Sequence, residues 1–325
     1  MKLIADDIYL GVSGTFKNLT MTPIVGGAHQ LPDYITLDQA LSSGAAHVTE
    51  VSASGSVPDL LFVNEGRSAV FLMDGEELIG AKQNRILSSS ILAPAESTIT
   101  IPVACVEAGR WSHVSGQFHS AGAALHGSAR SSKAHSVTHS FDCIGQARAD
   151  QYALWADLEA KASRMRAASE TRSMRHIYDK HSDQLAEYVA AFAPLDPTRG
   201  AVFGIGGEIA GMDLFDCPET FETLMPKLLR SYALDALDCE GYPGRPGGKI
   251  APEEFLDSVR PAHTRSHKSA GEGEDVRLVA AGLDGGALVA RNRMVHLCAF
   301  PAAASAESNY PDEQQGRSRS WREWR

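Results

Sequence analysis

The sequence predicts an α+β protein, in which a strand-rich N-terminal part, sandwich-like or roll-like, packs with a C-terminal part of helices and hairpins. Short apolar runs separated by turn residues fill the first 115 residues. Stretches with apolar residues at helical spacing follow from residue 146, and glycine-centred hairpins come after them. We expect residues 1–300 to form one unit, with residues 116–145 as a loop or lid and residues 301–325 as a disordered tail.

The N-terminal elements are bounded by turn residues. We expect strands at residues 47–51, 60–63, 69–72, 86–92 and 99–105. A short helix should follow Thr36, because Thr36 can cap it and Gln39, three residues on, completes a capping box. Gly44 should end this helix.

The remaining elements change character at Gln117. From Gln117 to Ser140 the residues are mainly Ser, Ala, Gly and His with little apolar periodicity, which indicates a long exposed loop. Helices are expected at residues 152–165 and 185–192 and from Asp216 onward, the last kinked or restarted at Pro226. We expect hairpins around Gly206-Gly207 and Asp284-Gly285-Gly286, and a polar linker at residues 262–274.

Composition excludes several classes of function. The 325 residues carry a net charge of −10, which argues against a nucleic-acid partner. No apolar stretch is long enough to span a membrane, and the N-terminus lacks the apolar core of a secretion signal. Five widely spaced cysteines with no CxxC pair are typical of reduced thiols, so we expect a cytoplasmic protein.

The polar run from Asp74 to Arg85 is the strongest candidate for a functional site. Between two apolar strands it contains Glu76, Glu77, Lys82, Gln83, Asn84 and Arg85. The amides offer paired donors and acceptors, and the arginine offers a planar fork for phosphate or carboxylate, so the set suits a nucleotide-like ligand. The alternative is a solvated hairpin with surface ion pairs.

A second polar run, from Cys105 to His113, offers complementary groups. Arg110 beside Trp111 can hold an anion and stack a ring, and Glu107 can act as an acid or base. The alternative is a strand end with a structural tryptophan.

Other patterns are weaker. His135, His139 and Cys143 have the i, i+4, i+8 spacing of metal ligands on a helix, but the segment is a poor helix former, so no metal site is expected. Residues 204–211 fail the GxGxxG pattern and read as a hairpin. Lys227, Ser231 and Asp235 should share a helix face, which we expect to be solvated.

Three segments together resemble one known family. They are residues 71–85, residues 101–111, and Asp213-Leu214-Phe215 with residues 226–236. The family is the bacterial domain named for its association with ADP-ribosylglycohydrolase and rhodanese/phosphatase domains. The resemblance runs from about Tyr9 to Phe300. Phe141 to Gln151 departs from the family's Gly-Ser-Tyr-Arg-Ser-Asp-Gln run, although Asp150-Gln151 and Trp155 agree with its end.

The resemblance implies binding or hydrolysis of ADP-ribose or another NAD-derived nucleotide, and it points to no particular cofactor. Glu76, Gln83, Asn84 and Arg85 would then hold the ligand, with Glu77 or Glu107 as acid–base groups. The alternative is a non-catalytic scaffold or partner-binding module. A ligand site should bring the two polar runs within about 15 Å in a cleft, whereas a scaffold should pair these side chains with one another.

Overall fold

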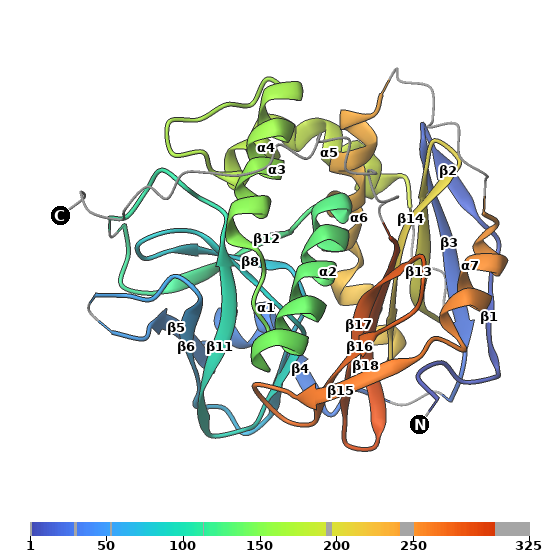
Figure 1. Cartoon of the computed structure of the whole chain (residues 1–325), viewed down its shortest axis with the longest axis horizontal. Helices are drawn as coiled ribbons and strands as arrows, with labels where there is room; N and C mark the ends of the chain where they lie inside the picture. The colour runs from blue at the N-terminus through green and yellow to red at the C-terminus, as the bar shows by residue number, and fades with distance from the viewer. Residues whose placement is uncertain are drawn as a thin grey trace, which may run out of the picture.

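Three β-sheets and the helices between and beside them make up the fold (Figure 1). The computed structural model describes residues 2–28, 31–52, 54–112, 114–192, 197–240 and 250–302. The α+β class predicted from the sequence is confirmed. The N-terminal strands, expected to form a sandwich or roll, instead form a closed barrel and a small sheet, and the first three strands join the C-terminal hairpins.

The barrel contains six strands in the order β11-β6-β5-β12-β8-β9. These are β5 (Ala46–Glu50), β6 (Asp59–Asn64), β8 (Glu76–Gly80), β9 (Arg85–Leu87), β11 (Ser97–Cys105) and β12 (Phe118–Ala124). Most of its interior is apolar, because side chains of one parity on each strand face inward and include Val48, Phe62, Leu78 and Val103. Closure leaves no unpaired edge.

A three-stranded sheet closes one side of the barrel core. It contains β4 (Tyr34–Thr36), β7 (Ala69–Leu72) and β10 (Ile91–Ala93). Helix α1 (Leu37–Ser42) is capped by Thr36, which forms the predicted capping box with Gln39. Gly44 follows the helix and has positive φ. The strand expected at residues 86–92 is interrupted, because Ser88 to Ser90 turn the chain from the barrel into this sheet.

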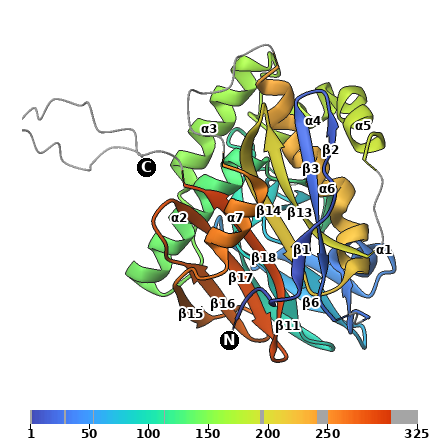
Figure 2. The ribbon, with the colours of Figure 1, turned by 90° about the vertical axis from the view of Figure 1, so that its right-hand side faces the viewer.

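A nine-stranded antiparallel sheet forms the other half of the fold (Figure 2). Its order is β1-β3-β13-β14-β18-β17-β16-β15, with β2 paired to β3. The strands are β1 (Ile8–Leu10), β2 (Gly14–Phe16), β3 (Leu19–Gly26), β13 (Thr198–Ile205), β14 (Glu208–Phe215), β15 (Thr264–Lys268), β16 (Glu274–Leu278), β17 (Leu283–Ala290) and β18 (Arg293–Pro301). The hairpin predicted around Gly206-Gly207 is confirmed as β13–β14.

Two long helices lie between the barrel and the large sheet. The helices are α2 (Gly127–Ile144), α3 (Gln151–Arg164), α4 (Met174–Lys180), α5 (Ser182–Ala190), α6 (Pro218–Asp238) and α7 (Pro252–Val259). α6 contacts β12 of the barrel and β13 of the sheet, while α2 packs on β17. α7 covers the opposite face of the sheet, where Phe255 and Leu256 join an apolar cluster with Val202 and Leu214.

The prediction of a loop or lid at residues 116–145 was wrong. Those residues form strand β12 and the 18-residue helix α2, which is capped by His126 and ended by Gly145. The helix escapes sequence analysis because its buried face carries small or charged residues, Ala134, Arg130 and Lys133 among them, which leave little apolar periodicity.

The C-terminal hairpin is also displaced from its predicted position. Asp284-Gly285-Gly286 lies inside β17, and the β17–β18 turn is at Arg291-Asn292, which have positive φ. A Cβ on Gly285 would lie 2.3 Å from the Cys298 carbonyl oxygen of β18, so close strand packing explains this glycine. Strand β15 occupies residues 264–268 of the expected linker, and β16 begins at its last residue, Glu274. Nearly all of the expected disordered tail, residues 303–325, lies outside the described residues.

Candidate functional site

One end of the barrel interior is polar, and the run predicted from the sequence lies there. Arg85 stands opposite Leu78 on β8 and Cys105 on β11. Because Leu78 belongs to the apolar cluster inside the barrel, Arg85 points inward as well. We call this end the barrel mouth; it comprises Glu50, Lys82, Gln83, Arg85, Cys105 and Trp111.

Several buried polar atoms at the barrel mouth have no hydrogen-bond partner. The Arg85 side chain is 0% exposed, and only its Nη1 donates a bond, of 3.4 Å to the Asn84 carbonyl. Arg85 Nε and Nη2, Gln83 Oε1 and Glu50 Oε2 have none among the described residues. Burial lowers the pKa of the Arg85 guanidinium. Buried groups of this kind are rare in folded proteins, so the mouth has unmet capacity to bind donors and acceptors.

Trp111 covers this polar end. Its ring lies 5.2 Å from Lys82 Nζ and 5.7 Å from Arg85 Cζ, both within cation–π range. The Trp111 side chain is 48% exposed, so the indole separates a buried cation from solvent. The Lys82 ammonium also donates to the Ser54 carbonyl at 2.5 Å. An aromatic ring and two cations therefore meet at one position.

The two predicted polar runs meet through Glu107. Its Oε2 accepts bonds from Arg110 Nη2 at 2.6 Å and from the Asn84 N–H at 3.1 Å. Arg110 Nη2 also donates to Asn84 Oδ1 at 3.1 Å, and Gln83 Nε2 donates to the Glu107 carbonyl. Burial raises the pKa of Glu107, but these bonds outweigh it and hold the pKa below its ordinary value. Glu107 is thus a carboxylate whose Oε2 accepts from both runs, through Asn84 and Arg110.

Glu76 lies away from the mouth. Its Oε1 accepts from Lys227 Nζ at 2.5 Å and its Oε2 from the Met73 N–H at 2.7 Å. Lys227 also bonds Asp38 of α1. This buried ion pair ties the barrel to α6, so the structure does not bring Glu76 together with the ligand-binding residues predicted beside it.

Glu77 is buried without a hydrogen-bond partner. Both of its carboxylate oxygens lack one among the described residues, and the residue is 1% exposed. Burial raises the pKa of Glu77 to about 8, with Arg175 of α4 acting in the opposite direction. Glu77 stands opposite Ile86, so it faces outward from the barrel and away from the Arg85 side. It could exchange a proton near neutral pH, but not inside the mouth.

Two other groups of residues noted in the sequence lie on helices α6 and α2. Lys227, Ser231 and Asp235 do share a helix face, but it is buried instead of solvated, because α6 lies between two sheets. His135, His139 and Cys143 lie on helix α2 after all, with Cys143 Sγ 3.5 Å from His139 Nε2 and His135 bonded to Asp284. Over the described ranges, no group of three or more His, Cys, Asp or Glu residues is placed to hold a metal ion.

A buried ionic network that the sequence did not indicate joins the barrel to the large sheet. Arg130 of α2 forms a two-bond contact with Asp213 at 2.6 and 2.9 Å, and Asp213 also contacts His296. Asp74, at the start of the predicted run, pairs with Lys133 and Arg130. Only the pairing of residues distant in sequence creates this network, so no local pattern could reveal it.

Comparison with models of protein families assigns the chain to one of them. A family model described as the ARG and Rhodanese-Phosphatase-superfamily-associated Protein domain, ARPP-1, matches residues 7–300. The chain belongs to this family. The ARPP-1 match spans the barrel, the helices between the sheets and the large sheet, so the resemblance seen in the sequence is confirmed.

The other comparisons add no relative to the ARPP-1 assignment. No curated protein and no solved structure matches this chain. None of the described helices is long and apolar enough to cross a membrane. The five cysteines are free thiols, three of them buried.

Proposed function

We propose that this ARPP-1 domain binds the anionic part of a small nucleotide-type ligand, ADP-ribose or another NAD-derived nucleotide, at the barrel mouth. The observation that carries this proposal is the Arg85 guanidinium, which is wholly buried beneath Trp111 and has two nitrogens without a hydrogen-bond partner among the described residues. A phosphate oxygen is the natural partner for such a fork. Swinging the Trp111 side chain aside would admit the ligand and offer its indole to a base or ribose.

Binding is favoured over hydrolysis by the positions of the three acidic residues. Glu107 is engaged by Arg110, Glu76 is paired with Lys227, and Glu77 faces the other side of the barrel wall. Glu50, which the sequence did not single out, is the carboxylate at the mouth that keeps an unbonded oxygen. Any acid–base step at the mouth would fall to Glu50.

One observation supports the scaffold alternative for three of the predicted site residues. Asn84, Glu107 and Arg110 are bonded to one another, as that alternative predicts. These three residues then hold the two polar runs together and shape the mouth instead of contacting the ligand.

The test is calorimetric titration of the full chain with ADP-ribose, ADP and adenosine. Wild type should bind ADP-ribose and ADP more tightly than adenosine. Trp111→Ala should weaken binding about tenfold or more, because base–aromatic stacking contributes about 1–3 kcal/mol. Arg85→Lys keeps the charge but loses the fork, so it should weaken ADP-ribose and ADP selectively.

Tyr152→Ala is the matched control, because Tyr152 is an exposed aromatic residue outside the mouth. It should bind like wild type. If wild type binds none of the three ligands, or if both mouth variants bind ADP-ribose as wild type does, the scaffold alternative is the better one.

A further inference from the structure

An opening lies where the barrel, the end of α2 and the edge of the large sheet meet. It has a volume of about 340 Å³, within the range of small-molecule sites. Its walls include Ser89 and Thr100 from the barrel side, Phe141 and Arg148 from the end of α2 and the loop after it, and Lys268 and Asp275 from the sheet. We call it the seam cleft.

Among the described charged side chains that line the seam cleft, one cation forms no ion pair. Arg148 is neutralised by Asp59, with Nη1–Oδ1 at 2.7 Å and Nη2–Oδ2 at 3.3 Å. Asp275 is paired with Arg277 at 3.2 Å. Lys268 is exposed and forms no ion pair within the described part of the chain, although Glu274 stands opposite it in the ladder. The cleft therefore offers one uncompensated positive charge to a ligand.

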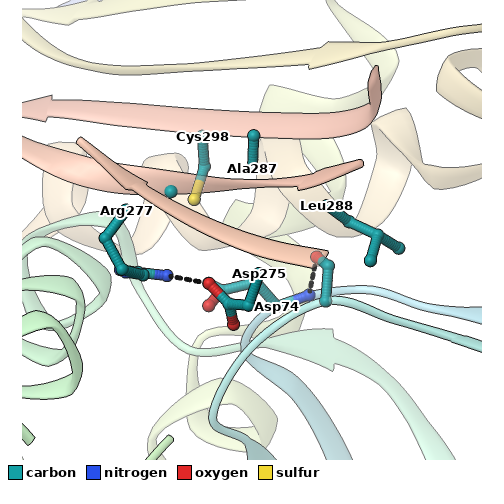
Figure 3. Close-up of a pocket in the computed structure, with 8 residues that line it drawn as sticks. Asp74, Asp275, Arg277, Ala287, Leu288 and Cys298 are labelled. Carbon is teal, nitrogen blue, oxygen red and sulfur yellow. Dashed lines mark hydrogen bonds and ion pairs between the residues drawn. The ribbon is translucent and has the colours of Figure 1, made fainter. Parts of the chain in front are cut away.

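Asp275 supplies the opposite kind of contact. It is 3% exposed, and its Oδ2 has no hydrogen-bond partner among the described residues. Figure 3 shows Asp275 and Arg277 joined beside Asp74. These residues line a separate cavity of about 10 Å³, which has room for about one water molecule. Asp275 lines both spaces. Because Arg277 already balances its charge, the free oxygen calls for a neutral donor, which a water in the small cavity or a ligand hydroxyl in the seam cleft can supply.

The remaining walls suit the same kind of ligand. Phe141 stacks on His267 with ring centroids 4.3 Å apart, which fixes the ring at the cleft wall. Ser89, Thr100 and Ser269 add hydroxyl groups that can donate or accept. An aromatic face with several hydroxyls and a carboxylate provides both apolar and polar contacts for a sugar.

We propose that the seam cleft binds a small polyhydroxylated ligand with one anionic group, of the sugar phosphate class. Its hydroxyls donate to Asp275 Oδ2, and its anion pairs with Lys268. The volume is near the lower end for ligand sites, which favours a monosaccharide phosphate over a dinucleotide.

The seam cleft is a different site from the barrel mouth, and the proposal does not depend on nucleotide binding there. Thr100 and Pro102 line the cleft, whereas Ile101, Val103 and Cys105 on the same strand point into the barrel. Alternation along β11 therefore puts the two sites on opposite sides of the barrel wall.

The experiment titrates the full chain with ribose 5-phosphate, ribose and inorganic phosphate. Wild type should bind ribose 5-phosphate more tightly than either part. Lys268→Ala should weaken ribose 5-phosphate about tenfold or more and leave ribose unchanged, because it removes one charged contact. Thr100→Trp places an indole in the cleft from an exposed position and should abolish both.

Lys2→Ala, which removes another exposed lysine, is the matched control and should bind like wild type. The proposal is overturned if wild type does not bind ribose 5-phosphate at millimolar concentration, or if Thr100→Trp binds it normally. It is also overturned if Trp111→Ala removes ribose 5-phosphate binding, because the ligand then sits at the barrel mouth.

Discussion

At the scale of single residues, Glu77 lies in surroundings that disfavour an ionised carboxylate. Its pKa in the folded chain is about 8, against an ordinary value of 4.5. A carboxyl whose pKa is raised by folding stabilises the fold below its unfolded-state pKa and loses that contribution as pH rises through the folded value. The stability linked to Glu77 should therefore decline between about pH 4.5 and pH 8, by on the order of 5 kcal/mol.

Glu77→Gln tests this expectation, because glutamine keeps the shape and cannot ionise. Urea unfolding at pH 5 and at pH 8 should show a smaller loss of stability for the variant than for wild type. Equal losses in the two proteins would mean that Glu77 is solvated or paired in solution.

Gly286 illustrates a residue whose role is purely steric. A Cβ there would lie 2.2 Å from Arg277 Nη1, a buried atom paired with Asp275. Gly286→Ala should therefore push the guanidinium out of place and destabilise the protein by about 2–4 kcal/mol, measured by urea unfolding. Gly282→Ala is a useful comparison, since open space surrounds that glycine and only its positive φ is at stake. Similar losses in both variants would contradict the steric explanation.

The polar run singled out in the sequence lies at the barrel mouth, but its residues are more deeply buried than the local pattern indicates. Arg85 lies in a turn-bounded polar run, a pattern typical of an exposed position, yet it is wholly buried, so replacing it will cost stability as well as binding. Trp155 lies in the helix predicted at residues 152–165, where its large apolar side chain would favour the buried face. It is instead partly exposed and donates to the Cys105 carbonyl, while Leu154 and Leu158 form the buried face. Residue type reveals a polar site; barrel closure, which buries it, depends on pairings distant in sequence.

At the scale of elements, helix α2 is attached to the large sheet at both ends by ion pairs of very different burial. Arg130 pairs with Asp213 where both side chains are 0% exposed, whereas Arg265 pairs with Asp142 at 54% and 37% exposure. Breaking a buried pair leaves an uncompensated charge, and breaking an exposed pair costs little.

Arg130→Met should therefore destabilise the chain by about 3–5 kcal/mol, and Arg265→Ala by less than about 1 kcal/mol. Thermal and urea unfolding of both variants give the measurement. Comparable effects would show that Asp213 is satisfied by His296 and Tyr232 without the arginine.

Element prediction succeeded where chemistry is local and failed where it is not. The Thr36 cap and the Gly206-Gly207 turn were predictable because their hydrogen bonds join neighbouring residues. Helix α2 was not, since its buried face is made of small and charged residues that find partners on β14 and in the barrel. The turn residues at 284–286 misled because strand packing, and not chain reversal, requires those glycines.

At the scale of the whole molecule, the barrel and the large sheet share one core. A single apolar cluster includes Phe71 and Ile86 from the barrel side and Phe203 and Leu288 from the sheet. The Asp74–Arg130–Asp213 network crosses the same boundary. We therefore expect residues 1–300 to unfold as one unit.

Differential scanning calorimetry should show one transition whose calorimetric and van 't Hoff enthalpies agree. Two separated transitions would instead indicate independent halves.

Acid should lower the stability of this unit. Burial raises the pKa of Asp213, but Arg130 and His296 outweigh it and hold the pKa well below the ordinary 3.8. Stability from a lowered carboxyl pKa is present above the ordinary value and is lost as pH falls below it.

The position of β3 in the large sheet has a consequence for synthesis on the ribosome. Its partner on one side is β13, with Val25 paired to Thr198. About 170 more residues must therefore be synthesised before that edge of β3 can be paired. At about 5–20 residues per second, the delay is on the order of 10–30 s. The barrel, contiguous between residues 46 and 124, can close during this interval. Nascent chains of this protein should therefore expose an apolar strand edge that a chaperone can hold until the sheet is completed.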